Sequence, residues 1–553
     1  MQQIREALAK ALKTQEVSVQ PEDIHLEHTE DFAHGDYASN VALAFAKQLK
    51  MPPRELAEKL AAEARDIEGI AAVEVAGPGF INFTLSLQYL VEMLEMGRTH
   101  GEKWGSGTGM SEQKVMVEYT DPNPFKEFHI GHLMSNAIGE SVSRLIEFSG
   151  ADVKRANYQG DVGPHVAKAI FAKKRSPEIP WGVAYKMGND LYEAFKDDID
   201  ELNRKIYDHS DKKINVLYEE GRNATLAEFE VLYKKLGTKF DFYFFESETA
   251  PRGVKIVRAH PELFEESDGA IVFKGEKYGL HTRVFITSQG LPTYEAKELG
   301  LAEMKAEKAT FDTSITITAH EQSDYFKVVK KAMELVMPDL AGKIEHISHG
   351  MMRLEGGKMS SRTGNVLSGV WLIGILTEVA RARATESRAT DKNTLAEQVA
   401  IAAIKYQILK GGTGKDIVFD QDRALSVEGD SGPYLQYTHA RTHAIMEKAK
   451  EAGVEGKFDA TQPANDLSDA KAGLARLVYR FYETVLHAQE ELEPHIVANY
   501  LISVASAFNS WYAQEQILDG TPAAAHKVAL TDITRLTLKN GLWLLGISAP
   551  EKV

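Results

Sequence analysis

Apolar residues recur at helical spacing at both ends of this sequence. Up to Leu12 they fall on one face of a predicted helix that also carries charges. From about Val370 to the end, almost every stretch repeats apolar residues at intervals of three and four, as in Val399–Ile408 and Tyr500–Trp511. Because this pattern is typical of packed helices, we predict an α-helical bundle at the C-terminus.

The N-terminal region adds a β pattern to its helices. Val73–Ser86 is interrupted by Gly77–Gly79, which predicts two strands joined by a turn. The Gly- and Ser-rich stretch Gly101–Gly109 then predicts a linker. The region before this linker is therefore predicted to be a separate domain of mixed α and β structure.

Strands and helices alternate in the middle of the chain. Val115–Tyr119 and Val153–Tyr158 are predicted strands, and a helix that ends near Phe148 lies between them. Strand, helix and strand in this order form one parallel unit. A second such unit, over Ser314–Ser348, follows a Lys-rich helical insertion, so the predicted parallel sheet is split.

Composition narrows the classes of function. The 553 residues carry 64 Lys and Arg against 80 Asp and Glu, a net charge of −16, which excludes a protein that coats nucleic acid with its whole surface. The absence of cysteine excludes disulfides, thiolate nucleophiles and Cys-ligated metal sites. Because no apolar run approaches the ~18 residues of a membrane span, we expect a soluble, cytoplasmic protein with no membrane partner.

Two short motifs carry the predicted chemistry. His129–His132 is the sequence HIGH, where the first helix of the split sheet begins, and Lys358–Arg362 is KMSSR in a Gly-rich loop after the last strand. A helix N-terminus and histidine donors suit a phosphate, Gly131 lets a nucleotide base approach, and a lysine supplies a mobile cation. Each motif alone is weak, but in this order the pair resembles the two signatures of class I aminoacyl-tRNA synthetases.

The chain resembles the arginyl-tRNA synthetases along nearly its whole length. The similar segments follow one another in the family's order: His34–Asn40, Ala76–Phe83, Val117–Leu145, Glu321–Lys327, His349–Val366, Asp416–Arg441, Glu491–Tyr512 and Asn540–Val553. The resemblance implies a multidomain protein with α/β and all-α parts. Its domains would be an α+β tRNA-binding domain over 1–100, a split Rossmann-like catalytic domain over 112–375 with an insertion at about 164–279, and an α-helical anticodon-binding domain over 390–553.

The resemblance also implies an arginine–tRNA ligase of protein biosynthesis. Arginine and ATP, with Mg²⁺, would form arginyl-adenylate and pyrophosphate, and the arginyl group would then pass to tRNA-Arg. Because no proton has to leave the carboxylate, positioning and charge neutralisation suffice for catalysis. No metal bound by the protein itself is predicted. The implied catalytic residues are His129, His132, Lys358 and Lys126. The implied ATP-binding residues are His129, Gly131, His132, Met352, Lys358, Ser360 and Ser361.

For arginine, the resemblance assigns both ends of the substrate. Glu118 and Asn123 match positions that hold the ammonium and carboxylate ends, and Tyr294, Glu298 and Gln322 match the side-chain pocket. A carboxylate suits a guanidinium because the pair can be bidentate. The family usually has Asp at the position of Glu298, and the extra methylene moves the carboxylate out by ~1.5 Å.

tRNA-Arg is the implied macromolecular partner, and the family's activation step typically requires it. The N-terminal domain would contact the corner of the tRNA near the D-loop, and the helical bundle would contact the anticodon. Unstacked bases are read by stacking and by hydrogen bonds. The candidate tRNA-binding residues are Tyr37, Asn40, Tyr437, Arg441 and Trp511. We expect the chain to act as a monomer.

Two alternatives remain open at this point. The first is another class I synthetase, specific for lysine or glutamate, although Glu118 and Glu298 argue against a glutamate pocket. The second is a tRNA-binding protein without activity, although such a protein would have no use for His129, His132 and Lys358.

Overall fold

The computed structural model describes the chain except for residue 1 and residues 355–367, 384–388 and 459–468. Lys358, Ser360 and Ser361 therefore lie outside the described residues. The fold comprises two compact units, each built from segments that are distant in sequence. The first unit contains Met1–Gly105, Arg441–Glu483 and Ser503–Asn540, and the second contains Ser106–Ala440, Thr484–Ile502 and Gly541–Val553.

The N-terminal part of the first unit has the predicted mixed α and β structure. A four-stranded antiparallel sheet has the order β1-β2-β4-β3, and β3 and β4 form the hairpin predicted around Gly77–Gly79. Helices of this part bury their apolar faces in one core with the sheet. The elements are α1 (Gln2–Thr14), β1 (Glu27–His28), β2 (Tyr37–Ser39), α2 (Val41–Leu49), α3 (Pro53–Glu63), β3 (Ile70–Ala76) and β4 (Phe80–Leu85).

Helices from the end of the chain complete the first unit. Trp104 donates its indole N–H to Thr537 Oγ1 at 2.9 Å, and Asn540 Nδ2 donates to the carbonyl oxygen of Trp104 at 2.8 Å. The predicted linker thus begins with a buried anchor. The helices that contribute wholly or in part are α4 (Leu87–His100), α17 (Gly432–Glu451), α18 (Asp469–Tyr479), α20 (His495–Gln514) and α21 (Ala524–Leu544).

The second unit is organised around a five-stranded sheet in which all strands are parallel. Its order is β12-β11-β5-β6-β7, so strands from both predicted βαβ units meet at its centre, where β11 pairs with β5. In open sheets of this type, ligands bind at the carboxyl ends of the strands beside such a switch point. The strands are β5 (Lys114–Glu118), β6 (Asp152–Gln159), β7 (Phe242–Phe245), β11 (Thr313–Ala319) and β12 (Ile344–His349).

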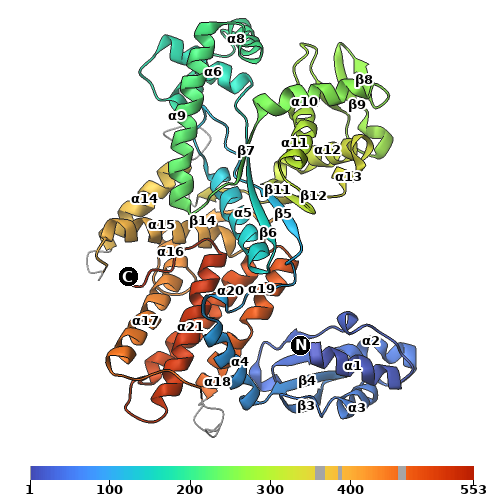
Figure 1. Cartoon of the computed structure of the whole chain (residues 1–553), viewed down its shortest axis with the longest axis vertical. Helices are drawn as coiled ribbons and strands as arrows, with labels where there is room; N and C mark the ends of the chain where they lie inside the picture. The colour runs from blue at the N-terminus through green and yellow to red at the C-terminus, as the bar shows by residue number, and fades with distance from the viewer. Residues whose placement is uncertain (1, 355–367, 384–388, 459–468) are drawn as a thin grey trace. The chain divides into compact units, whose positions relative to one another are not determined.

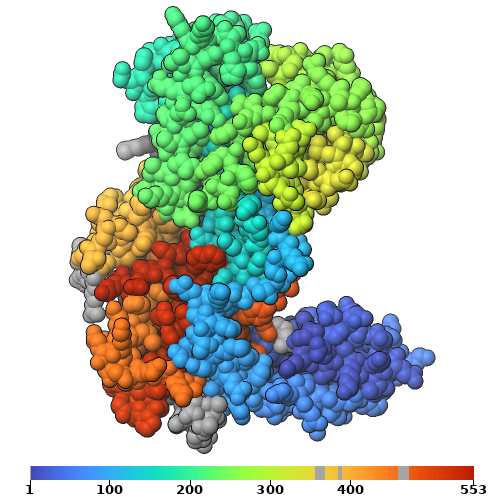
Figure 2. Space-filling view, viewed as in Figure 1, coloured from blue at the N-terminus to red at the C-terminus, as the bar shows by residue number. Residues whose placement is uncertain are grey.

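The predicted insertion at about 164–279 contains a strand of this sheet, because β7 pairs with β6. A helical segment therefore precedes β7, and a second segment, with its own three-stranded sheet β10-β9-β8, follows it. Both segments stand at the same end of the second unit (Figures 1 and 2). The first contains α6 (Pro164–Arg175), α7 (Trp181–Asp190), α8 (Lys196–Asp208) and α9 (Lys212–Leu236). The second contains α10 (Glu246–Ala259), β8 (Phe264–Ser267), β9 (Ala270–Phe273), β10 (Arg283–Ile286), α11 (Tyr294–Lys308) and α12 (Ser323–Val336).

The rest of the second unit is largely helical, as predicted. The short strands β13 (Met352–Leu354) and β14 (Ile417–Phe419) pair in parallel. The region predicted as a C-terminal domain from residue 390 is shared between the two units, since its residues up to Ala440, Thr484–Ile502 and Gly541–Val553 belong to the second unit. The helices are α14 (Gly369–Arg383), α15 (Lys392–Leu409), α16 (Gln421–Ala424) and α19 (Phe481–Glu490). Across the described ranges, none of the helices is long and apolar enough to span a membrane.

Candidate active site

A cavity of about 510 Å³ opens in the second unit, where β5, β6 and β11 end. The HIGH motif and the predicted arginine residues come from three separate parts of the chain, and the fold brings them together here. The predicted residues that line the cavity are Glu118, Asn123, His129, Gly131, His132, Tyr294, Glu298 and Gln322.

The HIGH motif is the N-terminal cap of α5 (Ile130–Phe148). His129 Nδ1 accepts the backbone N–H of Gly131 at 3.1 Å, and His132 Nδ1 accepts the backbone N–H of His129 at 3.2 Å. Both rings therefore carry their proton on Nε2. Burial and the nearby Lys126 lower the pKa of His129 to about 4, and burial lowers the pKa of His132 well below its usual value. The pair is thus neutral near pH 7 and offers two N–H donors.

Two glycines make room for site side chains. A Cβ on Gly131 would lie 2.9 Å from Cε1 of His129, so the glycine lets the imidazole fold back over the helix start. A Cβ on Gly160 would lie 2.2 Å from Oδ1 of Asn123, so this glycine lets the amide pack against the backbone after β6. Each glycine thus preserves the position of a predicted substrate-binding residue.

The loop between β5 and α5 has an unusual backbone. Thr120, Asp121 and Phe125 have φ values of 81°, 44° and 68°, in the left-handed region that non-glycine residues seldom adopt. Hydrogen bonds hold this loop: the N–H of Thr120 donates to Ser135 Oγ at 2.9 Å, and the N–H of Tyr158 donates to Asp121 Oδ1 at 2.7 Å. Strained residues of this kind concentrate at functional sites.

Carboxylates converge at the inner end of the cavity. Glu118 is 1 % exposed at the end of β5, and Glu298 is 8 % exposed on α11. Tyr325 donates to Glu298 Oε1 at 3.1 Å. Burial and the charge of Glu118 together raise the pKa of Glu298 to about 8. The cavity therefore holds crowded acidic groups whose ionised form a cationic ligand would stabilise.

Lys126 and Lys297 are cations beside the cavity. The Lys126 ammonium lies 5.1 Å from the centre of the Tyr185 ring, and burial lowers its pKa. Lys297 Nζ lies 2.5 Å from Glu246 Oε2, and both side chains of this ion pair are buried. Lys126, which has no comparably close ion pair in the described part of the chain, is the better placed to meet an anion.

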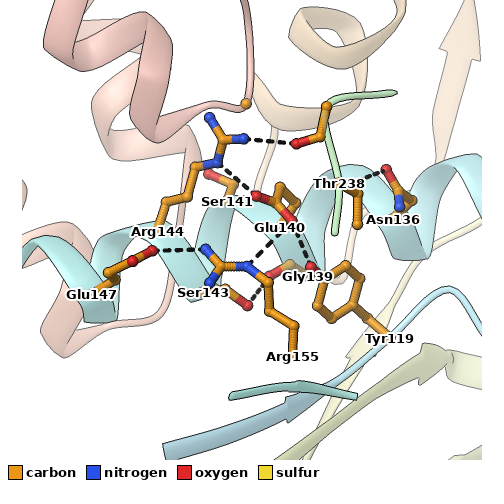
Figure 3. Close-up of polar contacts among 12 residues, drawn as sticks. Tyr119, Asn136, Gly139, Glu140, Ser141, Ser143, Arg144, Glu147, Arg155 and Thr238 are labelled. Atoms are coloured by element: carbon orange, nitrogen blue, oxygen red, sulfur yellow. Dashed lines mark hydrogen bonds and ion pairs between the residues drawn. The ribbon is translucent and has the colours of Figure 1, made fainter. Parts of the chain in front are cut away.

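A polar network anchors α5 from within the second unit (Figure 3). Tyr119 Oη donates to Glu140 Oε2 at 2.5 Å, and Arg144 Nε donates to Glu140 Oε1 at 2.7 Å. Burial raises the pKa of Glu140, but Arg144 and Arg155 outweigh it and hold that pKa below its usual value. Arg144 also donates to the carbonyl oxygen of Trp543 at 2.8 Å. The helix that begins at HIGH is thus tied to β5, β6 and the C-terminal segment.

Some site residues were not predicted from the sequence. Asp121, Glu246, Arg283 and Tyr325 line the cavity, and Lys305 lies 2.8 Å from Glu118 Oε2. Lys305 had a detectable signal, because it lies two turns after Glu298 on the apolar face of α11. The others have no periodic signal that would separate them from ordinary surface residues.

The remaining predicted ATP and tRNA residues lie elsewhere. Met352 is buried in β13, just before the stretch of undescribed residues that holds the KMSSR motif. Tyr437 is 39 % exposed on α17, and Arg441 of the same helix donates to Asn509 Oδ1. Asn40 is half-buried at the start of α2. These last three side chains retain surface that RNA could reach.

Two predicted tRNA contacts are contradicted by burial. Trp511 is 0 % exposed and packs in the helical part of the first unit, so no base can stack on it. Tyr37 is also 0 % exposed, and its hydroxyl donates to Glu483 Oε2 at 3.0 Å. Both side chains are core residues of the first unit. Helical or strand spacing alone is always compatible with a buried position of this kind for an aromatic side chain.

Comparison with known families agrees with this geometry. Residues 99–421 match the family model described as tRNA synthetases class I (R), catalytic domain. The chain is thus a class I tRNA synthetase, the class to which the parallel sheet and the HIGH cap point. Residues 2–85 match the arginyl tRNA synthetase N terminal domain, and residues 435–553 match the DALR anticodon binding domain. Within its class, the chain belongs to the arginyl-tRNA synthetase family.

Individual relatives support the same family. The chain is 31 % identical to an arginine–tRNA ligase of Clostridium perfringens, over 96 % of this chain and 97 % of the relative. It is 30 % identical to that of Clostridioides difficile, over the full length of both. Among solved structures, the arginyl-tRNA synthetase of Thermus thermophilus superposes with a TM-score of 0.82 at 26 % identity, over 99 % of each chain.

Proposed function

We propose that the cavity at the end of β5 is where arginine and ATP react in the ligation of arginine to tRNA-Arg, the reaction of this family in translation. One observation carries this proposal: two neutral histidines at the N-terminus of α5 and two buried carboxylates, Glu118 and Glu298, line the same cavity. One side suits phosphates and the other suits a cationic side chain.

The ATP side consists of α5 and its surroundings. The Nε2–H groups of His129 and His132 would donate to phosphate oxygens, assisted by the positive end of the helix. Lys126 would neutralise part of the charge that develops on the pyrophosphate, together with Lys358. Ser360, Ser361 and Met352 would complete the site as the family resemblance implies. Mg²⁺ would arrive as its complex with ATP, as the family resemblance implies.

The arginine side lies at the inner carboxylates. Because the charge of Glu118 acts directly on Glu298, we place both at the guanidinium end, rather than Glu118 at the ammonium end as the sequence suggested. Asn123 would then hold the other end of arginine, and Tyr294 and Gln322 would close the rim. A small cavity of about 20 Å³ behind Glu298 gives this longer side chain room to lean back.

The second step would transfer the arginyl group to the terminal ribose of tRNA-Arg. Asn40, Tyr437 and Arg441 remain the proposed RNA contacts, within proposed tRNA-binding regions at 1–100 and 390–553. We also propose that the chain acts as a monomer. The absence of cysteine fits a reducing cytoplasm.

The experiment that tests this function is arginine-dependent ATP–pyrophosphate exchange, with and without tRNA-Arg. We expect exchange with arginine, none with lysine or glutamate, and dependence on tRNA-Arg. Exchange without tRNA would preserve the reaction and remove the proposed dependence. No exchange with arginine, in a preparation that still binds tRNA-Arg, would refute the proposal.

A further inference from the structure

Lys305 is a buried cation that the proposed mechanism does not use. Its side chain is 4 % exposed, and its Nζ lies 2.8 Å from Glu118 Oε2. The same ammonium lies 3.5 Å from Ser314 Oγ and 3.4 Å from Thr316 Oγ1, both on β11. A lysine is seldom buried to this degree without a function in charge compensation.

Three carboxyl groups interact electrostatically with this one ammonium. They are Glu118 at the end of β5, Asp121 in the following loop and Glu298 on α11, so the ionised cluster would carry two uncompensated negative charges. The other titratable groups that act on this cluster are Tyr158 of β6, Glu246 of α10 and Tyr325 of α12. Burial and Glu118 raise the pKa of both Glu298 and Asp121, so protons partly replace the missing cation near neutral pH.

We propose that Lys305 is a positioning residue for arginine, which holds the Glu118 carboxylate in place while the guanidinium pairs with Glu298. The inference rests on the proposed assignment of this cavity to arginine. The proton balance is simple: neutral Glu298 and cationic arginine give an ion pair and one proton released to solvent. No bond other than the O–H bond of Glu298 is broken.

The geometry favours different roles for Glu118 and Glu298. The contact at 2.8 Å commits Oε2 of Glu118 to Lys305 and leaves its other oxygen to a ligand. A carboxylate that is already fixed loses little conformational entropy when a guanidinium binds. Less of the interaction free energy is then spent on ordering the side chain, and the binding affinity is higher. Glu298, whose only close hydrogen bond in the described chain comes from Tyr325, is left to respond to the ligand.

The proposal has a signature in the pH dependence of arginine binding. If one group with a pKa of about 8 must lose its proton, the arginine KM should rise about tenfold from pH 9 to pH 7. In K305M, the pKa of Glu298 loses the lowering effect of the Lys305 charge, so the rise should steepen toward its one-proton limit of about a hundredfold. K305R keeps the charge and should behave like wild type. A lysine that only filled space would change the arginine KM by one factor at every pH.

The test is steady-state ATP–pyrophosphate exchange with the full-length wild type, K305M and K305R, with saturating tRNA-Arg between pH 6.5 and 9.5. Each variant is compared with wild type at the same pH, because free arginine titrates in this range too. We expect the arginine KM of K305M to steepen with pH while its ATP KM follows wild type. A wild-type slope in K305M, or K305R behaving like K305M, would overturn the inference.

Two further variants separate this inference from the proposed function. E298Q should weaken the binding of arginine and abolish the pH dependence that the arginine KM has in wild type. If E298Q changes neither the arginine KM nor its pH dependence, the cavity is not the arginine site and the proposed function fails. E118Q removes the charge that raises the pKa of Glu298 and frees Lys305 to pair with it, so it should flatten the pH dependence. If K305M does not fold, E118Q provides the test instead. A pH dependence of the arginine KM in E118Q equal to that of wild type also overturns the proposal.

Discussion

The imidazole rings of His129 and His132 stack on one another at the start of α5, with ring centroids 3.6 Å apart and planes inclined by 21°. Each ring uses Nδ1 to accept a backbone N–H of the same turn. The motif therefore caps the helix and, with the same two side chains, presents two N–H donors. Because both rings are neutral, they do not repel each other as two stacked cations would, even when no phosphate is bound.

Replacement of His129 by Asn is expected to impair catalysis more than binding. The variant loses one preorganised donor, which costs about 10²–10³ in kcat at sites of this kind, while the arginine KM changes little. The kinetics of ATP–pyrophosphate exchange at saturating arginine measure this loss in kcat directly. Because the pKa of His129 is about 4, the wild-type rate should show no inflection between pH 5.5 and 7.5 from this residue. An inflection that disappears in the variant would show that the ring titrates there.

The fold and the centre of the site followed from local patterns in the sequence. HIGH was located because Gly131 and two histidines at a helix start form a short motif. The strands β5, β6, β11 and β12 were located because strand patterns alternate with helical ones there. The edge strand β7 was missed because its four residues adjoin a long helical segment. Spacing alone could not separate a buried aromatic such as Trp511 from an exposed one, because burial is decided by which elements pack together.

Ionic partners were the least predictable part of the site. Lys305 and Glu118 are distant in sequence, and only the pairing of β11 with β5 brings α11 close to the end of β5. The effect of Lys126 on His129 depends likewise on how the loop before α5 folds back, with a positive φ at Phe125. Sequence patterns report periodicity and turns, but long-range charge contacts depend on the assembled fold.

Replacement of Gly160 by Ala should raise the arginine KM selectively. The new methyl group would lie 2.2 Å from Asn123 Oδ1 and 3.0 Å from Glu246 Oε1, so the Asn123 side chain must move. We expect an increase of about tenfold or more in the arginine KM, because small displacements of positioning groups are costly. Gly374→Ala is the matched control, since nothing lies within 4 Å of its added Cβ. Equal effects of the two substitutions would contradict the proposed position of Asn123.

Replacement of Tyr37 by Phe should destabilise the first unit without weakening the binding of tRNA-Arg. The hydroxyl donates to the partly buried carboxylate of Glu483, and hydrogen bonds to charged groups contribute about 1.5–3 kcal/mol. Thermal unfolding should therefore shift to lower temperature. Filter binding of tRNA-Arg should show no loss for Tyr37→Phe, with Tyr482→Phe, on an exposed tyrosine outside the proposed RNA contacts, as the control. A reduced affinity in the folded variant would restore Tyr37 as an RNA contact.

Lys405 should make stability depend on pH in the neutral to alkaline range. Its Nζ donates to the carbonyl oxygens of Leu236 at 2.6 Å and Gly546 at 2.8 Å, and burial with the nearby Arg144 lowers its pKa to about 7. An unfolded lysine keeps its proton to about pH 10.4, so between these values the unfolded state binds more protons than the folded state. The free energy of unfolding should therefore rise with pH in this window, by at most about 1.4 kcal/mol per pH unit.

The comparison of wild type with Lys405→Met isolates this effect from other titrations. Methionine fills a similar volume, cannot be protonated and leaves the two carbonyl oxygens without their donor. The difference in melting temperature between wild type and variant should move in favour of wild type from pH 6.5 to pH 9.5, as the buried lysine loses its charge in the folded state. Lys392→Met, on an exposed side chain at the start of α15, should show no such trend. If the difference for Lys405→Met is constant over this range, the ammonium keeps its proton throughout, and its two carbonyl contacts outweigh the cost of burial.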